Sequence, residues 1–257
     1  MTGPGDLLAA FRADRSDALV AVDFDGTLSP IVDDPAEARP LDGVPDALDR
    51  LSSSYGEVAV ISGRPLDFLE RWFPPPSGVT LVGLYGLEVR RRGSRQDHPS
   101  SGVWRETMAD VAGLARLQGP ADMDVELKGL SITLHYRRHP EIADKVEEWA
   151  AQMAPPAGLR VRPAKMSVEL HPPIDEDKGT VLRRLASDHG GPVLFAGDDV
   201  GDLPAFDYLD GLAATGRAVL RIAVDGPEVP DDLSRRADLL LDGPAAVSQV
   251  ILDLAPV

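Results

Sequence analysis

Two carboxylates, Asp23 and Asp25, lie two residues apart directly after the apolar run Ala18–Val22, and a glycine and a threonine follow them. The apolar run predicts a short buried strand. Carboxylates at the end of such a strand are poorly placed for packing, but well placed to bind a cation and attack an electrophile. The alternative is an acidic turn, because Asp and Gly are common turn residues.

Three further polar clusters favour the chemical interpretation. Ser62-Gly63-Arg64 follows the apolar segment 57–61, and Gly-Asp-Asp-Val-Gly-Asp at 197–202 follows the segment 192–196. Lys178 is expected at the start of a helix. Each cluster alone has a simpler explanation, such as a turn, a solvated lysine or a helix N-cap. Ligands of parallel sheets bind beyond the carboxyl ends of the strands, so we expect these clusters to meet there.

Short apolar strands and helices alternate along most of the chain. This alternation predicts an α/β fold in which a parallel sheet is covered by helices on both faces. The expected strands cover residues 18–22, 57–61, 79–82, 192–196, 218–224 and 238–241. The expected helices cover residues 46–53, about 66–72, 178–188 after the cap Asp177, and 245–254 after Pro244.

The middle of the chain breaks this rhythm. Its pattern predicts an α+β insert, with a helix at 103–117, strands at 122–128 and 131–137, a helix at 141–153, and strands at 159–162 and 166–170. We therefore expect one domain formed by residues 1–97 and 173–257, with a second domain, residues 98–172, inserted into it. Arg90-Arg91-Arg92 is expected to form a solvated hairpin edge.

The composition limits the possible partners. The 257 residues include no cysteine, which excludes disulfides and thiolate metal sites, and no apolar run near the length of a membrane span. The first residues lack the basic start and apolar stretch of a signal peptide, so we expect a cytoplasmic protein. A net charge of −16 disfavours nucleic acid and anionic membranes as partners. We expect a monomer that acts on a small molecule.

The four clusters, in this order, resemble the motifs of the haloacid dehalogenase (HAD) superfamily of phosphotransferases. Asp-Phe-Asp-Gly-Thr at 23–27 is similar to the first motif, Ser62 to the second, Lys178 to the third and Gly197–Asp202 to the fourth. The resemblance implies a Rossmann-like core in which Asp23 attacks phosphorus and forms an aspartyl phosphate.

The same resemblance implies the other catalytic roles. Asp25 would protonate the leaving alcohol and later activate water, and Ser62 and Lys178 would stabilise the transferring phosphoryl group. It implies Mg²⁺ as the cofactor, held by Asp23, the backbone carbonyl of Asp25, and Asp198.

More narrowly, the chain looks like the trehalose-6-phosphate phosphatases. The segments that carry this similarity are 83–88, 125–129, 134–137, 168–172 and 241–244. The family implies that the insert is an αββαββ cap and that the substrate is trehalose 6-phosphate. By resemblance Glu88, Lys128 and Glu169 would bind the sugar hydroxyls, and Arg64 would line the entrance near the phosphate.

Two positions depart from the family pattern, and two alternatives stay open. Tyr85 stands where the family usually has His, and His171 where it usually has Arg. The substrate is then open to another sugar phosphate, such as a glycosyl-phosphoglycerate or sucrose phosphate. An inactive domain that regulates a glycosyltransferase is the second alternative. Such a domain would usually have lost its nucleophile or a metal ligand, whereas this chain retains Asp23 and Asp198.

Overall fold

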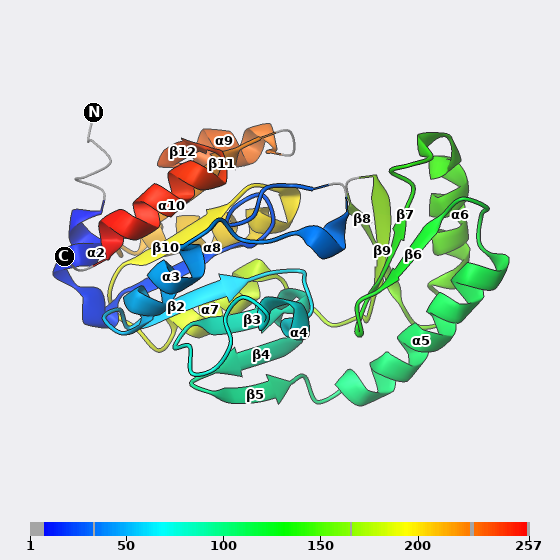
Figure 1. Cartoon of the computed structure of the whole chain (residues 1–257), viewed down its shortest axis with the longest axis horizontal. Helices are drawn as coiled ribbons and strands as arrows, with labels where there is room; N and C mark the ends of the chain where they lie inside the picture. The colour runs from blue at the N-terminus through cyan, green and yellow to red at the C-terminus, as the bar shows by residue number, and fades with distance from the viewer. Residues whose placement is uncertain (1–7, 33, 165, 227–228, 256–257) are drawn as a thin grey trace. The chain divides into compact units, whose positions relative to one another are not determined.

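The structure, a computed structural model, describes residues 8–32, 34–164, 166–226 and 229–255. The residues on which the signal-peptide expectation rests, Met1–Asp6, and Lys165 lie outside these ranges. The chain divides into two compact units (Figure 1). The first combines Met1–Gln96 with Glu176–Val257, and the second is Asp97–Asp175. Within the described ranges, no helix has the length and apolar character needed to cross a membrane.

The first unit is built on an eight-stranded sheet in the order β12-β11-β10-β1-β2-β3-β4-β5 (Figure 1). Neighbouring strands from β12 to β3 are parallel, and β4 runs antiparallel to β3. The strands are β1 (Leu19–Val22), β2 (Glu57–Ile61), β3 (Thr80–Gly83), β4 (Glu88–Arg91), β5 (Ser94–Asp97), β10 (Val193–Gly197), β11 (Val219–Asp225) and β12 (Leu239–Asp242).

Helices cover both faces of this sheet, as the continuous apolar strands predict. Every residue of β1, β2, β3 and β10 is buried. One face packs against α2 (Ala9–Ala13), α3 (Val44–Ser52), α4 (Leu66–Leu69) and α10 (Gly243–Leu254). The other face packs against α7 (Lys178–Ala186), α8 (Leu203–Ala214) and α9 (Asp231–Arg236).

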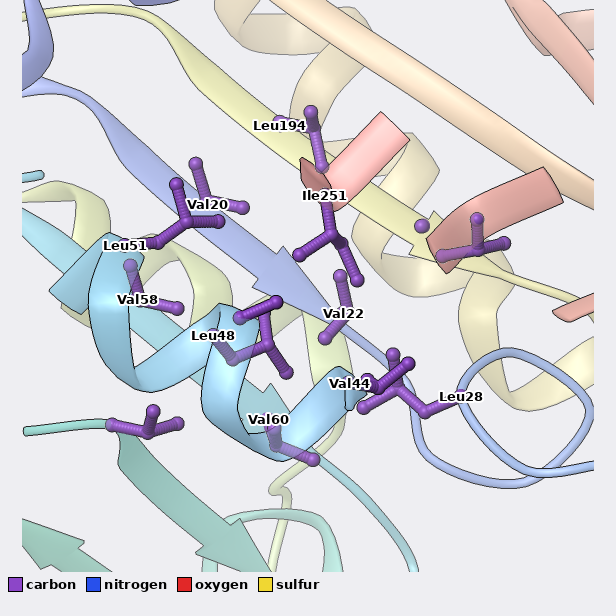
Figure 2. Close-up of a cluster of buried hydrophobic side chains, with 14 of the residues drawn as sticks. Val20, Val22, Leu28, Val44, Leu48, Leu51, Val58, Val60, Leu194 and Ile251 are labelled. Carbon is purple, nitrogen blue, oxygen red and sulfur yellow. The ribbon is translucent and has the colours of Figure 1, made fainter. Parts of the chain in front are cut away.

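The two faces of β1 belong to different apolar cores. Val20 and Val22 point to the core that includes Leu48 of α3 and Ile251 of α10 (Figure 2), whereas Leu19 contributes to the opposite core. Each fully buried Val or Leu contributes about 1.5–3 kcal/mol. Packing on both faces therefore fixes the strand, and with it the position of the residues that follow it.

The second unit contains a four-stranded antiparallel sheet in the order β6-β7-β9-β8. Its elements are α5 (Ser101–Gln118), β6 (Asp124–Leu127), β7 (Ile132–His135), the 3-10 helix η4 (Pro140–Ile142), α6 (Ala143–Met153), β8 (Arg160–Ala164) and β9 (Ser167–His171). Ile132 and Leu134 of β7 pack in one core with residues of α5 and α6. The alternate residue Thr133 lies on the opposite face of the sheet. That this unit works as a cap stays a prediction.

The structure differs from the expected elements at several positions. The helix expected to reach Trp72 ends at Leu69, and α8 and α9 were not predicted. The remaining 3-10 helices are η1 (Arg15–Asp17), η2 (Pro35–Glu37), η3 (Leu84–Gly86) and η5 (Val200–Asp202).

The expectation of a solvated arginine run was wrong for Arg90 and Arg91, whereas Arg92 is exposed in the turn after β4. Arg90 is only 4% exposed, and the guanidinium of Arg91 lies 2.7 Å from a carboxylate oxygen of Glu57. For Arg91 the physical reason is the buried Glu57 on another strand, which compensates its charge. Arg90 Nη1 lies 3.6 Å from Glu70 Oε1.

Candidate active site

Several of the predicted functional side chains lie near the carboxyl ends of three adjacent strands. In the parallel register, Val22 of β1 pairs with Val60 of β2 and with Ala196 of β10. Asp23, Ser62 and Asp198 follow these strands within two residues. The backbone N–H of Asp23 continues the ladder by donating to the carbonyl of Ala196 at 2.9 Å. The sheet register thus gathers residues that are up to 175 positions apart in the sequence.

Three buried carboxylates form one cluster. Asp23, Asp198 and Asp202 each offer one oxygen, and these oxygens lie within 4.8 Å of one another. The Nζ of Lys178 lies 2.7 Å from Asp23 Oδ1 and 2.5 Å from Asp202 Oδ1. One lysine therefore partly compensates three buried acidic groups.

Asp202 has a supporting position in this cluster. Its Oδ2 accepts hydrogen bonds from the backbone N–H groups of Asp198 at 2.8 Å and Asp199 at 3.0 Å. Asp202 thereby fixes the loop after β10 and binds Lys178 with its other oxygen. The Oδ1 of Asp199 is buried and has no hydrogen-bond partner within the described part of the chain.

The position of Lys178 follows from a local helix signal. Lys178 is the first residue of α7, and the Asp177 side chain accepts from the N–H of Thr180 at 2.7 Å. The Thr180 hydroxyl in turn accepts from the N–H of Asp177 at 2.8 Å. The sequence predicted Asp177 as the cap; the reciprocal bond from Asp177 N–H to Thr180 completes a capping box, which orients the first turn and the lysine within it.

Burial and mutual repulsion dominate the electrostatics of the cluster. Burial raises the pKa of Asp23 well above its usual range, although Lys178 opposes this shift. Burial and the neighbouring Asp23 raise the pKa of Asp198 to about 10, and burial raises that of Asp202 to about 6. Burial lowers the pKa of Lys178, but Asp202 and Asp23 outweigh it, so the net shift is upward. The cluster therefore favours an additional positive charge.

A glycine is required beside these carboxylates. Gly26 has a φ of +71°, which favours glycine, and a Cβ at this position would lie 2.0 Å from Asp198 Oδ2. The glycine after the two aspartates thus permits both the tight turn and the close approach of Asp198.

Asp25, Ser62 and Arg64 form a second group at the same edge of the sheet. Arg64 donates from Nε to Asp25 Oδ2 at 2.8 Å and from Nη2 to Asp25 Oδ1 at 2.7 Å. Ser62 is 1% exposed, and its Oγ accepts from the backbone N–H of Arg64 at 3.1 Å. Arg64, predicted to lie near the substrate phosphate, is therefore bound to the predicted acid–base residue.

The three predicted sugar-binding residues lie in both units. Glu88, in β4 of the first unit, is 2% exposed and its Oε2 accepts from the N–H of Leu66 at the start of α4, at 2.8 Å. Lys128 and Glu169 belong to the second unit. Lys128 Nζ lies 3.7 Å from Glu126 Oε2, and Glu169 Oε2 lies 3.6 Å from Arg162 Nη1. Their sugar contacts stay predictions.

Tyr85, which stands where the family usually has His, lies next to the Ser62 group. The backbone N–H of Tyr85 donates to the Ser62 carbonyl at 3.0 Å, and a Cβ at Gly63 would lie 2.7 Å from its ring. Leu84 and Tyr85 both have positive φ, 48° and 55°. Such strained backbone gathers at functional sites. The flanking glycines, Gly83 and Gly86, are the sequence signal of this sharp loop.

Comparison of the fold gives the class of protein first. The chain superposes on a haloacid dehalogenase-like hydrolase from Bacteroides thetaiotaomicron with a TM-score of 0.57 and 16% identity, over 91% of this chain and 98% of that chain. It superposes on the trehalose-6-phosphate phosphatase C-terminal domain of C. albicans with a TM-score of 0.78 and 26% identity, over 99% and 97% of the two chains. The fold is HAD-like.

Comparison of the sequence then gives the family. The model of the trehalose-phosphatase family matches residues 21–238. The trehalose-phosphate phosphatase of Mycobacterium avium (strain 104) is 35% identical over 272 aligned residues, which cover 99% of this chain and 65% of that protein. This chain belongs to the trehalose-phosphatase family, and it spans about 65% of the length of that curated relative.

Proposed function

We propose that this chain is a magnesium-dependent phosphatase that hydrolyses trehalose 6-phosphate to trehalose and phosphate through an aspartyl phosphate. The observation that carries the proposal is the contact of the buried Asp23 carboxylate with Lys178, inside a cluster of three carboxylates, in a chain of the trehalose-phosphatase family. A carboxylate and a cation are the pair needed to attack an anionic phosphate ester.

The chain's own residues have distinct roles in this reaction. A carboxylate oxygen of Asp23 forms a bond to phosphorus while the ester P–O bond breaks, and Asp25 gives a proton to the leaving sugar oxygen. Lys178 reduces the repulsion between Asp23 and the phosphate, and Ser62 donates to a phosphoryl oxygen. Water then attacks phosphorus, Asp25 takes its proton, and Asp23 regains its carboxylate.

The residues of the cluster fit Mg²⁺. Hard oxygen donors are its preferred ligands, and the raised pKa of Asp198, caused by burial and by Asp23, marks a site that lacks compensating charge. Asp23 and Asp198 would hold the ion with the backbone carbonyl of Asp25. When bound, the ion supplies positive charge that stabilises the anionic nucleophile and the phosphoryl group. Asp202 would hold Lys178 and the loop after β10 in place through its hydrogen bonds, without being a metal ligand itself.

Phosphate release from a panel of sugar phosphates, with Mg²⁺ and with excess EDTA, tests the proposal. We expect trehalose 6-phosphate to give the highest kcat/KM and EDTA to abolish turnover. Full activity in EDTA would exclude the metal. A preference for sucrose phosphate or a glycosyl-phosphoglycerate would leave the chain a phosphatase with a different sugar, which the departures at Tyr85 and His171 keep open.

The alternative from another class is an inactive domain that regulates a glycosyltransferase. The intact pair of Asp23 and Lys178 is the feature that disfavours it. Absence of turnover on the whole panel, with Mg²⁺ bound, would support this alternative.

A further inference from the structure

Arg64 forms a bidentate contact with Asp25, in which each carboxylate oxygen accepts one hydrogen bond. Nε donates to Oδ2 at 2.8 Å, and Nη2 donates to Oδ1 at 2.7 Å. Both oxygens therefore accept a hydrogen bond from the guanidinium, which can only donate. The planar fork of arginine fixes both the position and the plane of the carboxylate.

Arg64 is itself held from several sides. Its Nη1 donates to the carbonyl of Pro35 at 2.6 Å, and its guanidinium carbon lies 4.6 Å from the centroid of the Phe68 ring. Its backbone N–H donates to Ser62 Oγ. The side chain is 11% exposed, whereas that of Asp25 is 31% exposed. The arginine is thus the more fixed partner of the pair.

Asp25, by contrast, has little regular structure to hold it. It lies past the end of β1, beside the positive-φ Gly26, and forms only an isolated bridge with Ser29. Because the Asp25 side chain is 31% exposed, we expect it to change rotamer more easily without Arg64.

We propose that Arg64 is a positioning residue that holds Asp25 as the base for the second half of the reaction. This inference rests on the proposed function. In that step water oxygen bonds to phosphorus, the P–O bond to Asp23 breaks with its electron pair returning to the Asp23 carboxylate, and the water proton moves to Asp25. A base must present an acceptor oxygen to the water at a fixed position, and the two contacts from Arg64 fix both oxygens of Asp25 as acceptors.

The first half of the reaction depends less on this contact. There Asp25 must give a proton to the leaving oxygen, so one of its oxygens is a donor and at least one bond to Arg64 is given up. Loss of Arg64 should therefore slow hydrolysis of the aspartyl phosphate more than its formation. A residue that binds the substrate phosphate would instead affect formation first.

Rapid-quench kinetics of Arg64→Met in the full chain with Mg²⁺ separates these roles. We expect kcat to fall about 10- to 100-fold, with kcat/KM on trehalose 6-phosphate within about threefold of wild type. A burst near one equivalent of sugar should precede the slow phase, and acid-quenched protein should carry the phosphoryl group. A fall in kcat/KM without accumulated phosphoprotein would overturn the proposal, because Arg64 would then serve substrate binding.

Two further variants complete the test. Arg71→Met is the matched control, because Arg71 lies over the same Phe68 ring at 5.0 Å, outside the contact with Asp25, and we expect wild-type kinetics. Arg64→Lys keeps a positive charge but cannot donate to both oxygens of Asp25 in the planar geometry of the guanidinium. We therefore expect a smaller fall in kcat than in Arg64→Met, with kcat/KM again near wild type. If Arg64→Met fails to fold, the changes in kcat and kcat/KM of Arg64→Lys test the proposal in its place: a fall in kcat alone supports it, and a fall in kcat/KM overturns it. A wild-type protein without turnover on any phosphate ester would refute the proposed function itself.

Discussion

At the scale of single residues, the demands on Asp23 conflict. As the proposed nucleophile, Asp23 must be ionised, yet burial among carboxylates raises the pKa of Asp23 and disfavours the ionised form. Lys178, 2.7 Å away, opposes this effect. The cluster is therefore electrostatically unfavourable in the ionised form, and a bound cation would relieve this repulsion.

Replacement of the nucleophile tests this directly. We expect Asp23→Asn to lower kcat by more than roughly a thousandfold, because an amide does not attack phosphorus. The melting temperature should stay the same or rise, because one of three buried acidic groups is removed. Phosphate-release assays and thermal denaturation of the same preparation measure both effects. Activity near wild type would refute the nucleophile assignment.

Asp198 gives a pH dependence to metal binding. Its pKa of about 10, raised by burial and by Asp23, means that it carries a proton at pH 7 in the metal-free protein. Because a metal ligand must be deprotonated, Mg²⁺ binding should release a proton and become tighter as the pH rises from about 6 to about 9. Calorimetric titration in two buffers of different ionisation enthalpy measures the release. Equal heats in both buffers would contradict this prediction.

At the scale of elements, the cap of α7 positions Lys178, the lysine of the proposed mechanism. Asp177→Ala removes the bond to the N–H of Thr180, and we expect a loss of about 0.5–2 kcal/mol in the free energy of unfolding. Because Lys178 is the next residue, kcat should fall as well. The control is Asp46→Ala in the first turn of α3, which makes no capping bond. Urea denaturation and phosphate release should be unchanged in the control; equal losses in both variants would refute the positioning role.

The antiparallel strand β4 is tied to the parallel sheet by a buried ion pair. Glu57 of β2 accepts two-pronged hydrogen bonds from Arg91 and a short one from the Thr80 hydroxyl. Burial raises the pKa of Glu57, but these bonds and the charge of Arg91 outweigh it, so the net pKa is lowered. Glu57 therefore stabilises the fold in its ionised form.

The sign of this shift sets the pH range of the effect. The stabilisation is fully present above the unfolded-state pKa of about 4.3 and is lost as the pH falls through the lower folded-state value. We expect Glu57→Gln to lower the free energy of unfolding by about 1.5–3 kcal/mol at pH 7. The difference from wild type should shrink towards about pH 3 in urea denaturation. A difference that is constant with pH would refute the ionised pairing.

The elements differ in how well sequence could predict them. The segment 57–61 was predicted with its observed bounds because a continuous apolar run in a buried strand leaves few alternatives. α8 was missed because its apolar residues surround the helix without a clear polar face. β5 was missed because all four residues of Ser94–Asp97 are polar and lie at the surface, so they have no apolar pattern. The burial of Arg90 and Arg91 depends on partners distant in sequence.

At the scale of the whole molecule, the net charge of −16 works against an anionic substrate. Lys178 is the lysine placed among the carboxylates, and Arg64 lies beside Asp25. The sequence indicated these residues through their types, their places near strand ends or a helix start, and their resemblance to the family motifs. The sequence did not predict the individual contacts, such as those of Lys178 with Asp23 and Asp202 or that of Arg64 with Asp25. These contacts depend on side-chain geometry, which residue spacing does not encode.

Recognition of the sugar involves residues of both units in the proposed function. Glu88→Ala, Lys128→Ala and Glu169→Ala should each lower kcat/KM on trehalose 6-phosphate by roughly ten- to hundredfold, because a hydrogen bond to a charged group contributes about 1.5–3 kcal/mol. Hydrolysis of p-nitrophenyl phosphate, which lacks the sugar, should change much less. Glu88 needs the control Arg95→Met, because Arg95 lies 3.4 Å from Glu88 Oε1; this variant should leave both activities near wild type. If the alanine variants lower both activities equally, these side chains support the fold and do not recognise the sugar.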